Sequence, residues 1–184
     1  MNLIISSEAD TASINLRDRL LENAEWKENG EFKGHIIWRL AKDYGSFCLE
    51  GTRLITINKL HIHAEKIDSE WFEETSLKIE NIVFLSRHKA ASRRPSLTVH
   101  PIGNWGKADY GGFSGKLSRT SPIWMTGLLL KIYENRLPGY DICFEATHHG
   151  PLLETPTMFL EIGSSEEQWE LREPAHALTK SLLE

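Results

Sequence analysis

"NLIISSEADTASINLRDRLLEN" (residues 2–23) opens the chain and indicates the class of its fold. The run from Asn2 to Ser6 is largely apolar and predicts a buried strand. The segment after it predicts a helix, because Asp10 or Thr11 can cap the first turn and apolar residues then recur every fourth position. Those apolar residues are Ala12, Leu16 and Leu20. A strand that leads directly into an amphipathic helix is typical of an α/β protein.

The rest of the chain continues to alternate between strand-like and helix-like segments. Expected strands are HIIWRL (35–40), SFCLE (46–50), RLITIN (53–58), NIVFLS (81–86), SLTVH (96–100), YDICFEA (140–146) and TMFLEIG (157–163). Expected helices are SEWFEET (69–75), residues 121–134, a short helix with a capping box of Ser165 and Gln168, and a final helix opened by Pro174. This order predicts one domain over residues 1–184, a three-layer α/β/α sandwich with a mixed, mostly parallel sheet.

The composition is that of an ordinary globular domain. Hydrophobic residues make up 40% and charged residues 26% of the chain, and no apolar run approaches the roughly 18 residues that span a bilayer. The short apolar start lacks the basic flank of a signal peptide. We therefore expect a cytoplasmic protein with two free thiols, Cys48 and Cys143, and neither a membrane nor a protein partner.

Positive charge is concentrated in one segment of an acidic chain. The formal net charge is -5, but residues 87–119 contain seven Lys or Arg residues and one acid, which gives a local charge of +6. Overall acidity argues against a nucleic-acid partner, whereas a local basic segment is what contact with phosphates requires. Charge alone leaves a nucleic-acid contact and a solvated basic loop equally open.

Polar clusters follow three of the predicted strands. They are SRHK (86–89), HPIGNWGK (100–107) and EATHHGP (145–151). Ligands of open α/β sheets bind beyond the carboxyl ends of the strands, so we expect the three clusters to meet there. FEATHHGP (144–151) is expected to mark the end of a central strand.

The adjacent imidazoles of His148 and His149 are the strongest catalytic candidates. An imidazole titrates near neutral pH, so it can take a proton from water or give one to a leaving oxygen. Glu145 or Thr147 would orient it, and Asn104 with neighbouring loop amides would hold a carbonyl group. The alternative is that one or both histidines only hydrogen-bond buried carbonyl groups. The sequence does not distinguish which imidazole moves the proton.

Several familiar kinds of site are absent from the sequence. The stretch GNWGKADYGGFSGKLS (103–118) is not a P-loop, because Ala108 and Leu117 replace the Ser or Thr required after Gly-Lys. No G-x-S-x-G elbow occurs and neither cysteine has a nucleophile context, which favours water as the nucleophile. His61 and His63 are expected on one exposed face of a strand, and no HExxH or Cys/His spacing specifies a metal site.

Three stretches together resemble the D-aminoacyl-tRNA deacylases of the archaeal and plant type. They are SEADTASINLRDRLLEN (7–23), FLSRHKAASRRPSLTVHPIGNWGKADYGG (84–112) and CFEATHHGPLLETPTMFLEIGSSEEQW (143–169). The resemblance implies hydrolysis of the ester that joins a D-amino acid to the 3′ end of tRNA. It also implies a fold similar to the phosphorylase/peptidyl-tRNA hydrolase group and a dependence on zinc, with no ligands specified. Members of the family usually continue further, so we expect the family's C-terminal region to be absent.

With that resemblance, the basic segment and the glycine-rich loop are expected to contact the acceptor end of an aminoacyl-tRNA. Trp105 would line the aminoacyl pocket, and His88 and His100 would lie beside the catalytic histidines or bind metal. The expected substrate contacts are Trp105, His100, Gly103, Gly106, Lys107, His88, Arg87, Arg93 and Arg94. Two alternatives stay open: a tRNA-end binding protein without catalysis, and a hydrolase of peptidyl-tRNA or another N-blocked aminoacyl-tRNA.

Overall fold

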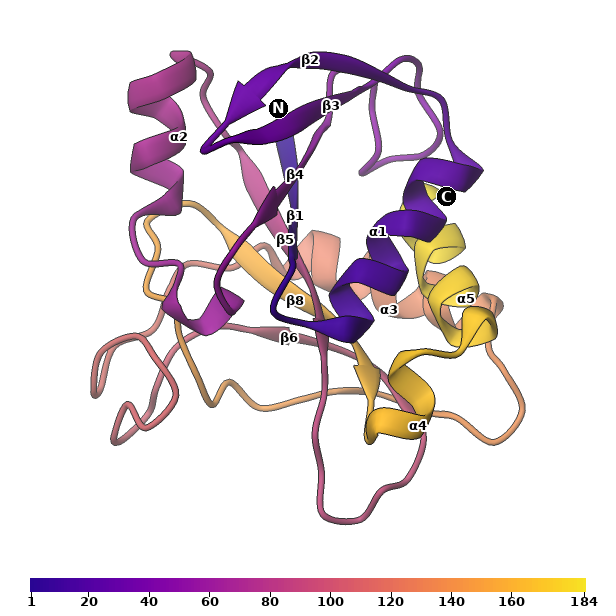
Figure 1. Ribbon diagram of the computed structural model, residues 1–184. Helices are drawn as coiled ribbons and strands as arrows, with labels where there is room; N and C mark the ends of the chain where they lie inside the picture. The colour runs from indigo at the N-terminus through magenta and orange to yellow at the C-terminus, as the bar shows by residue number, and fades with distance from the viewer.

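The computed structural model describes residues 1–184. It consists of an eight-stranded sheet with helices on both faces (Figure 1). The strands are β1 (Asn2–Ser7), β2 (Trp26–Phe32), β3 (His35–Leu40), β4 (Arg53–Ile57), β5 (Asn81–Arg87), β6 (Ser96–Pro101), β7 (Asp141–Phe144) and β8 (Thr157–Gly163). The helices are α1 (Thr11–Asn23), α2 (Ile67–Thr75), α3 (Pro122–Glu134), α4 (Glu166–Trp169) and α5 (Arg172–Leu183), with a 3₁₀ turn η1 at His61–His63. The predicted α/β class is confirmed.

The sheet has the strand order β2-β3-β4-β1-β5-β8-β6-β7. The pairs β1–β4, β1–β5, β5–β8 and β6–β7 are parallel. The pairs β2–β3, β3–β4 and β6–β8 are antiparallel. The prediction of a mixed, mostly parallel sheet is therefore confirmed. The antiparallel pairing of β6 with β8 matters for the site, because it reverses the direction of β6 and β7 relative to β5.

Two apolar cores, one on each face of the sheet, account for the three layers. On β1, Ile4 packs into the core that contains residues of α1, α3 and α5, whereas Leu3 and Ile5 pack into the core that contains residues of α2. Successive side chains of a strand point to opposite faces, so an unbroken apolar run suits a strand that is covered on both sides. None of the helices has the length and apolarity that crossing a bilayer demands.

The structure differs from the predicted elements at three places. SFCLE (46–50) is a connection without strand structure, because Tyr44 N–H closes a turn on Cys48 O at 3.0 Å and the Cys48 thiol is buried. β2 was missed because its centre is polar and contains Asn-Gly. LHIH forms the turn η1 rather than a strand, and His61 is buried rather than exposed.

The strand before the histidine pair lies at the edge of the sheet, so the prediction of a central strand there is wrong. β7 pairs with β6 alone, and most of its residues are exposed. After β7 the chain turns back toward β6: Glu145 N–H donates to Val99 O at 3.1 Å, and Gly103 N–H donates to His149 O at 2.7 Å. This return carries both histidines from the edge of the sheet to its interior.

Candidate active site

The candidate site is assembled across three neighbouring strands. His88 follows β5, Glu161 lies in β8 and His100 lies in β6, with Thr98 directly opposite Glu161. Because β6 runs opposite to β5, the carboxyl ends of these two strands point in opposite directions. The histidines of the three clusters do converge, but they do so over one face of the sheet rather than beyond the strand ends. Phe159, which stacks on His100 with 5.1 Å between ring centroids, belongs to the core on the α2 side.

Three imidazoles, His100, His148 and His149, form what we term the imidazole cluster. Their ring centroids are 4.6 to 5.0 Å apart, and each offers a ring nitrogen within 4.8 Å of those of the other two. His100 and His149 are buried, whereas His148 is exposed to solvent. The cluster thus reaches from the sheet interior to the surface.

The backbone fixes the tautomer of all three imidazoles. Nδ1 lies 2.8 Å from Pro101 O in His100, 2.8 Å from Ala146 O in His148 and 2.7 Å from Gly150 O in His149. A carbonyl oxygen only accepts hydrogen bonds, so each Nδ1 carries a proton, and Nε2 is the ring nitrogen that presents a lone pair when the imidazole is neutral. His100 Nε2 is buried without a hydrogen-bond partner, although Glu161 Oε2 lies 3.5 Å away.

Two carboxylates and one imidazolium lie beside the imidazole cluster. His88 Nδ1 is 3.0 Å from Glu145 Oε2 and 3.6 Å from Glu161 Oε2. The hydrogen bond with Glu145, followed by that with Glu161, raises the pKa of His88 to about 10. Burial acts to raise the pKa of Glu161, but the neighbouring His100 and His88 hold it well below the usual range. His88 is therefore a cation and Glu161 an anion at neutral pH.

Burial keeps His149 and His61 neutral. Desolvation, helped by the nearby His100, lowers the pKa of His149 to about 4, and desolvation lowers the pKa of His61 to about 3. Asp10, which caps α1 through Ser13 N–H, also accepts a hydrogen bond from Arg87 N–H at 3.1 Å, and burial raises its pKa. Neutral imidazoles in a charged surrounding are able to accept a proton or a metal ion.

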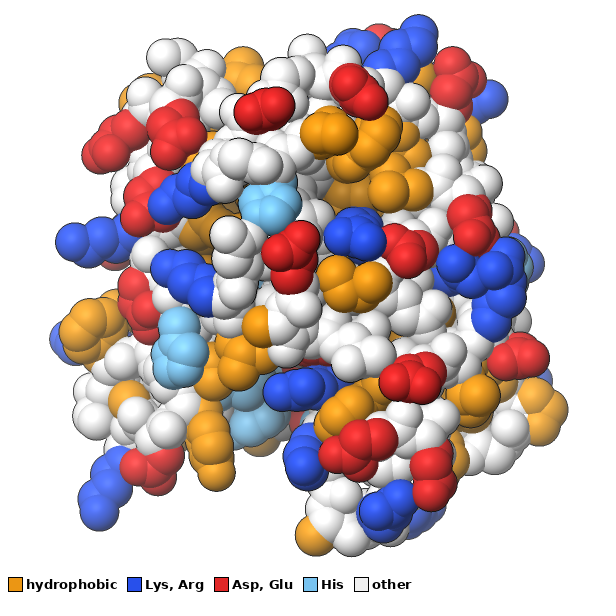
Figure 2. Space-filling view, viewed as in Figure 1, with side chains coloured by type: hydrophobic (Ala, Val, Ile, Leu, Met, Phe, Trp, Pro, Cys, Tyr) orange, Lys and Arg blue, Asp and Glu red, His pale blue; other side chains and the backbone are white.

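A cleft of about 520 Å³ opens onto these groups. Figure 2 shows a histidine recessed in the lower half of the visible face, with hydrophobic and basic side chains around it. The lining residues are Asp10, Leu60, His61, Ile62, Ser86, Arg87, His88, Lys89, Tyr110, His148, His149 and Glu161. Of these, Asp10, His61, Tyr110 and Glu161 were not predicted as site residues. Glu161 carried a usable signal, since it is the only charge in the apolar strand TMFLEIG.

Several predicted roles do not match the contacts. Glu145 contacts His88 rather than His148 or His149, and Thr147 Oγ1 donates to Gly103 O at 2.9 Å. The Asn104 amide donates to Gly111 O at 2.9 Å, which ties the glycine-rich loop together. The predicted contacts Trp105, Gly106 and Lys107 lie outside the cleft lining. Glu145 and Thr147 thus position neighbouring groups instead of orienting the histidine pair.

The basic segment is partly neutralised by acids of the same chain. Arg93 Nη2 lies 2.9 Å from Glu167, and Arg94 Nη2 lies 2.7 Å from Asp141. Arg87 lines the cleft, with its guanidinium 5.1 Å from the ring centre of Trp169. Of the predicted cationic contacts in β5 and the loop after it, Arg87 alone reaches the site.

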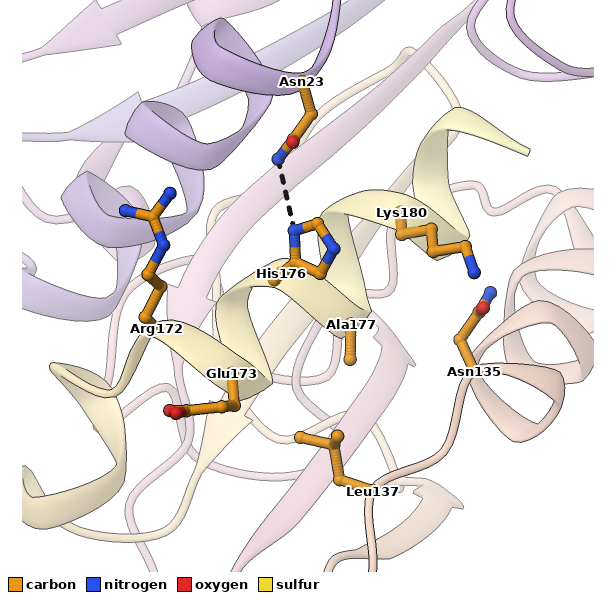
Figure 3. Close-up of a pocket in the computed structure, with 8 residues that line it drawn as sticks. All are labelled: Asn23, Asn135, Leu137, Arg172, Glu173, His176, Ala177 and Lys180. Carbon is orange, nitrogen blue, oxygen red and sulfur yellow. Dashed lines mark hydrogen bonds between the residues drawn. The ribbon is translucent and has the colours of Figure 1, made fainter.

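A second depression, of about 480 Å³, lies between α1, α5 and the segment after α3 (Figure 3). Its lining residues are Asn23, Asn135, Leu137, Arg172, Glu173, His176, Ala177 and Lys180. His176 Nδ1 lies 3.4 Å from the Asn23 amide, and no predicted site residue is present. It therefore lacks the grouped imidazoles and carboxylates of the cleft.

The eight-stranded mixed sheet with helices on both faces defines an α/β fold that solved structures of other proteins share. The purine nucleoside phosphorylase of Toxoplasma gondii has a similar fold, with a TM-score of 0.61 at 11% identity over 99% of this chain and 88% of that one. The profile of the D-aminoacyl-tRNA deacylase family matches residues 75–184. The chain belongs to this family, as the sequence motifs predicted.

Individual relatives agree with the family assignment. A D-aminoacyl-tRNA deacylase of Pyrococcus furiosus is 42% identical over 92% of this chain and 60% of its own length. One of Arabidopsis thaliana is 39% identical over 97% of this chain and 56% of its own length. The crystal structure of AF0625, a conserved protein of unknown function, superposes with a TM-score of 0.87 at 33% identity, over all of this chain and 62% of that one. The chain thus spans 60% of the length of the Pyrococcus furiosus relative and 56% of that of the Arabidopsis thaliana relative.

Proposed function

We propose that the chain hydrolyses the ester between a D-amino acid and the 3′ ribose of tRNA. The observation that carries this proposal is the imidazole cluster, whose Nε2 atoms are left free by Nδ1 contacts to backbone carbonyls beside an open cleft. Hydrolysis of an ester needs an activated water and a group that stabilises the developing oxyanion. Membership of a family named for this reaction supports the same conclusion.

We further propose that His100, His148 and His149 hold a zinc ion through Nε2. Metal-bound histidines commonly donate the other ring N–H to a carbonyl or carboxylate, and all three have that arrangement here. The buried, unpartnered Nε2 of His100 is a second feature that suits a cation. When bound, zinc would polarise the ester carbonyl and make water more acidic.

The remaining groups of the site have separate tasks in the proposed reaction. Glu145 Oε2 lies 3.0 Å from His88 Nδ1 and holds that imidazole in its cationic form. The positive charge of His88 at the cleft favours a substrate carbonyl oxygen on which negative charge develops. If no zinc binds, the neutral His149 is the group that takes the proton at Nε2.

The proposed substrate also explains the remaining positive charge near the cleft. Arg87 and Lys89 line it, and a tRNA acceptor end brings phosphates close to the reacting ester. A tRNA substrate also implies that the protein works in the cytoplasm.

Single-turnover deacylation of D-tyrosyl-tRNA and L-tyrosyl-tRNA tests the proposal. We expect hydrolysis of the D-substrate, little of the L-substrate, and a loss of roughly 10²- to 10⁴-fold in His149→Ala. His176→Ala is the matched control, since it removes an exposed imidazole from the second depression. Equal rates for the two enantiomers would contradict the proposed substrate, and full activity of His149→Ala would contradict the proposed role of the imidazole cluster.

The same assay separates the two alternative functions. A tRNA-end binding protein would bind tRNA in a salt-dependent way and release no amino acid, with or without added zinc. A hydrolase of N-blocked substrates would prefer N-acetyl-D-tyrosyl-tRNA over the free aminoacyl form. Our proposal predicts turnover, and it predicts that the substrate with a free amino group is hydrolysed at least as fast.

A further inference from the structure

Three aromatic side chains project into solvent from a single loop. We term residues 103–118, the glycine-rich segment between β6 and α3, the aromatic loop. Trp105, Tyr110 and Phe113 are 74%, 65% and 56% exposed. No ring of the three lies against another aromatic ring or under a cation within the protein. Exposed apolar side chains grouped on one loop are a candidate binding surface.

The aromatic loop is held in place although its aromatic rings are not. Asn104 N–H donates to Lys116 O at 2.8 Å, Gly115 N–H donates to Gly106 O at 2.9 Å, and Gly112 N–H donates to Glu65 Oε1 at 2.8 Å. These bonds close the loop on itself and anchor it to the segment before α2. The rings are therefore carried by an ordered loop, whose backbone has its position before any ligand binds.

The aromatic loop also holds part of the unpaired positive charge of the basic segment. Lys89, Arg93 and Arg94 each have a carboxylate within 3.4 Å. Lys107, Lys116 and Arg119 form no ion pair with the rest of the chain. The surface that remains attractive to phosphate thus includes Arg87 at the cleft and the aromatic loop with Arg119 directly after it, although Asp109 offsets part of this charge.

Direct contacts join the aromatic loop to the candidate active site. Tyr110 lines the cleft together with His148 and His149. Gly150 N–H donates to Tyr110 O at 3.0 Å, and a Cβ built on Gly150 would lie 2.2 Å from Gly112 N, so the two backbones touch. Tyr110 thus lies at the cleft, and Trp105 and Phe113 belong to the same loop.

We propose that the aromatic loop binds the unpaired nucleotides at the 3′ end of tRNA by stacking bases on Trp105, Tyr110 and Phe113. The inference rests on the proposed function, because it places the end of that substrate along the loop. Aromatic rings accept any base, and nearby lysines neutralise the backbone phosphates, which is the usual way to bind single-stranded nucleic acid. Lys107 and Lys116 supply these charges.

Binding of an RNA that carries no amino acid tests the loop independently of the reaction. The probe is a fluorescently labelled single-stranded pentanucleotide that ends in CCA, and its affinity is measured by anisotropy. We expect Trp105→Ala and Phe113→Ala each to weaken binding about tenfold, with Trp105→Phe restoring most of the loss. Phe72→Ala and Tyr133→Ala are matched controls, because these rings are 55% and 59% exposed on α2 and α3. The controls should bind as wild type does.

Deacylation kinetics then separate failure of the loop from failure of the function. In steady-state hydrolysis of D-tyrosyl-tRNA, the loop variants should raise KM about tenfold and change kcat less than twofold. Oligonucleotide binding without hydrolysis by wild type would overturn the proposed function and leave the loop assignment standing. Hydrolysis with unchanged KM and unchanged oligonucleotide binding in both loop variants would overturn the loop assignment alone. A change of oligomeric state in Trp105→Ala, measured by sedimentation, would instead identify the loop as a contact between copies.

Discussion

Glu161 is a buried carboxylate in the middle of an apolar strand, and it decides the charge of the groups around it. It is 2% exposed and lies within 3.6 Å of His88 Nδ1 and His100 Nε2. A buried charge is tolerated only with partners, so the two imidazoles on the flanking strands stabilise it and are in turn held by it. The anionic form of Glu161 raises the pKa of His100 despite complete burial.

The substitution Glu161→Gln tests this dependence. We expect the free energy of unfolding to fall by about 1–3 kcal/mol, because a buried imidazole loses its charged partner. The pKa of His100, followed by NMR in the metal-free protein, should fall at the same time, since burial lowers this pKa and Glu161 is the main group that opposes burial. Glu167→Gln, at an exposed ion pair with Arg93, is the control and should change stability by less than about 0.5 kcal/mol. If Glu161→Gln and Glu167→Gln lowered the free energy of unfolding equally, the charge of Glu161 would have no special part in stabilising its neighbours.

Single residues also show the limit of sequence reasoning about the site. His148 and His149 were predicted because two imidazoles next to Gly-Pro are unusual in any context. Glu161 and His61 were not, although Glu161 stands out as the only charge in an apolar strand. Their importance depends on which strands are neighbours, and local sequence does not encode that order.

At the scale of the elements, prediction succeeded where hydrophobic pattern and capping agree. β1 followed by α1, and α4 with its capping box of Ser165 and Gln168, were predicted and are confirmed. The β2–β3 hairpin was half missed, because strands at the edge of a sheet tolerate polar residues. The direction of β6 was missed for a different reason: β8, which separates β6 from β5, comes more than 50 residues later in the chain.

The close contact between Gly111 of the aromatic loop and Ile62 of η1 predicts that the loop tolerates no side chain at this position. A Cβ on Gly111 would lie 1.7 Å from Ile62 O, and Gly111 has a φ of +72°. We expect Gly111→Ala to displace the loop, to destabilise the protein by about 3 kcal/mol, and to lower deacylation, because the loop backbone is bonded to the histidine segment. Gly115→Ala is the control: its φ of +66° is similar, but nothing lies within 4 Å of the added atom.

Thermal unfolding and single-turnover deacylation of both glycine variants check that expectation. Gly115→Ala should lose only the roughly 1–2 kcal/mol that a left-handed backbone costs a non-glycine residue, and it should retain activity. If both variants lose the same stability and the same activity, the close contact with Ile62 has no special part in positioning the loop.

For the whole molecule, the proposed zinc ion would join segments that are far apart in sequence. His100 lies in β6, whereas His148 and His149 follow β7, so one ion would fasten the returning chain to the sheet. A ligand that binds only the folded state raises its stability according to the free ligand concentration. Metal content and stability should therefore change together.

Elemental analysis and thermal unfolding measure this coupling without any substrate. We expect about one zinc ion per chain, a fall in Tm of several degrees on treatment with a chelator, and recovery on adding zinc. His149→Ala should contain no zinc and show no response to the chelator. His63→Ala, which removes an exposed histidine of η1, should behave as wild type does. A metal-free wild-type protein with unchanged Tm would remove zinc from the proposal.

The contacts of His88 with Glu145 and Glu161 make the stability of the whole fold depend on pH. These hydrogen bonds raise the pKa of His88 to about 10, compared with about 6.5 for an imidazole in an unfolded chain. The folded state binds the proton more tightly, so the stabilisation is fully present below about pH 6.5 and is lost as the pH rises toward 10. In urea unfolding of the chelator-treated protein, the loss of stability caused by His88→Gln should therefore shrink across this interval. The loss caused by His176→Gln should stay constant, and a constant difference for His88→Gln as well would show that its charge does not stabilise the fold.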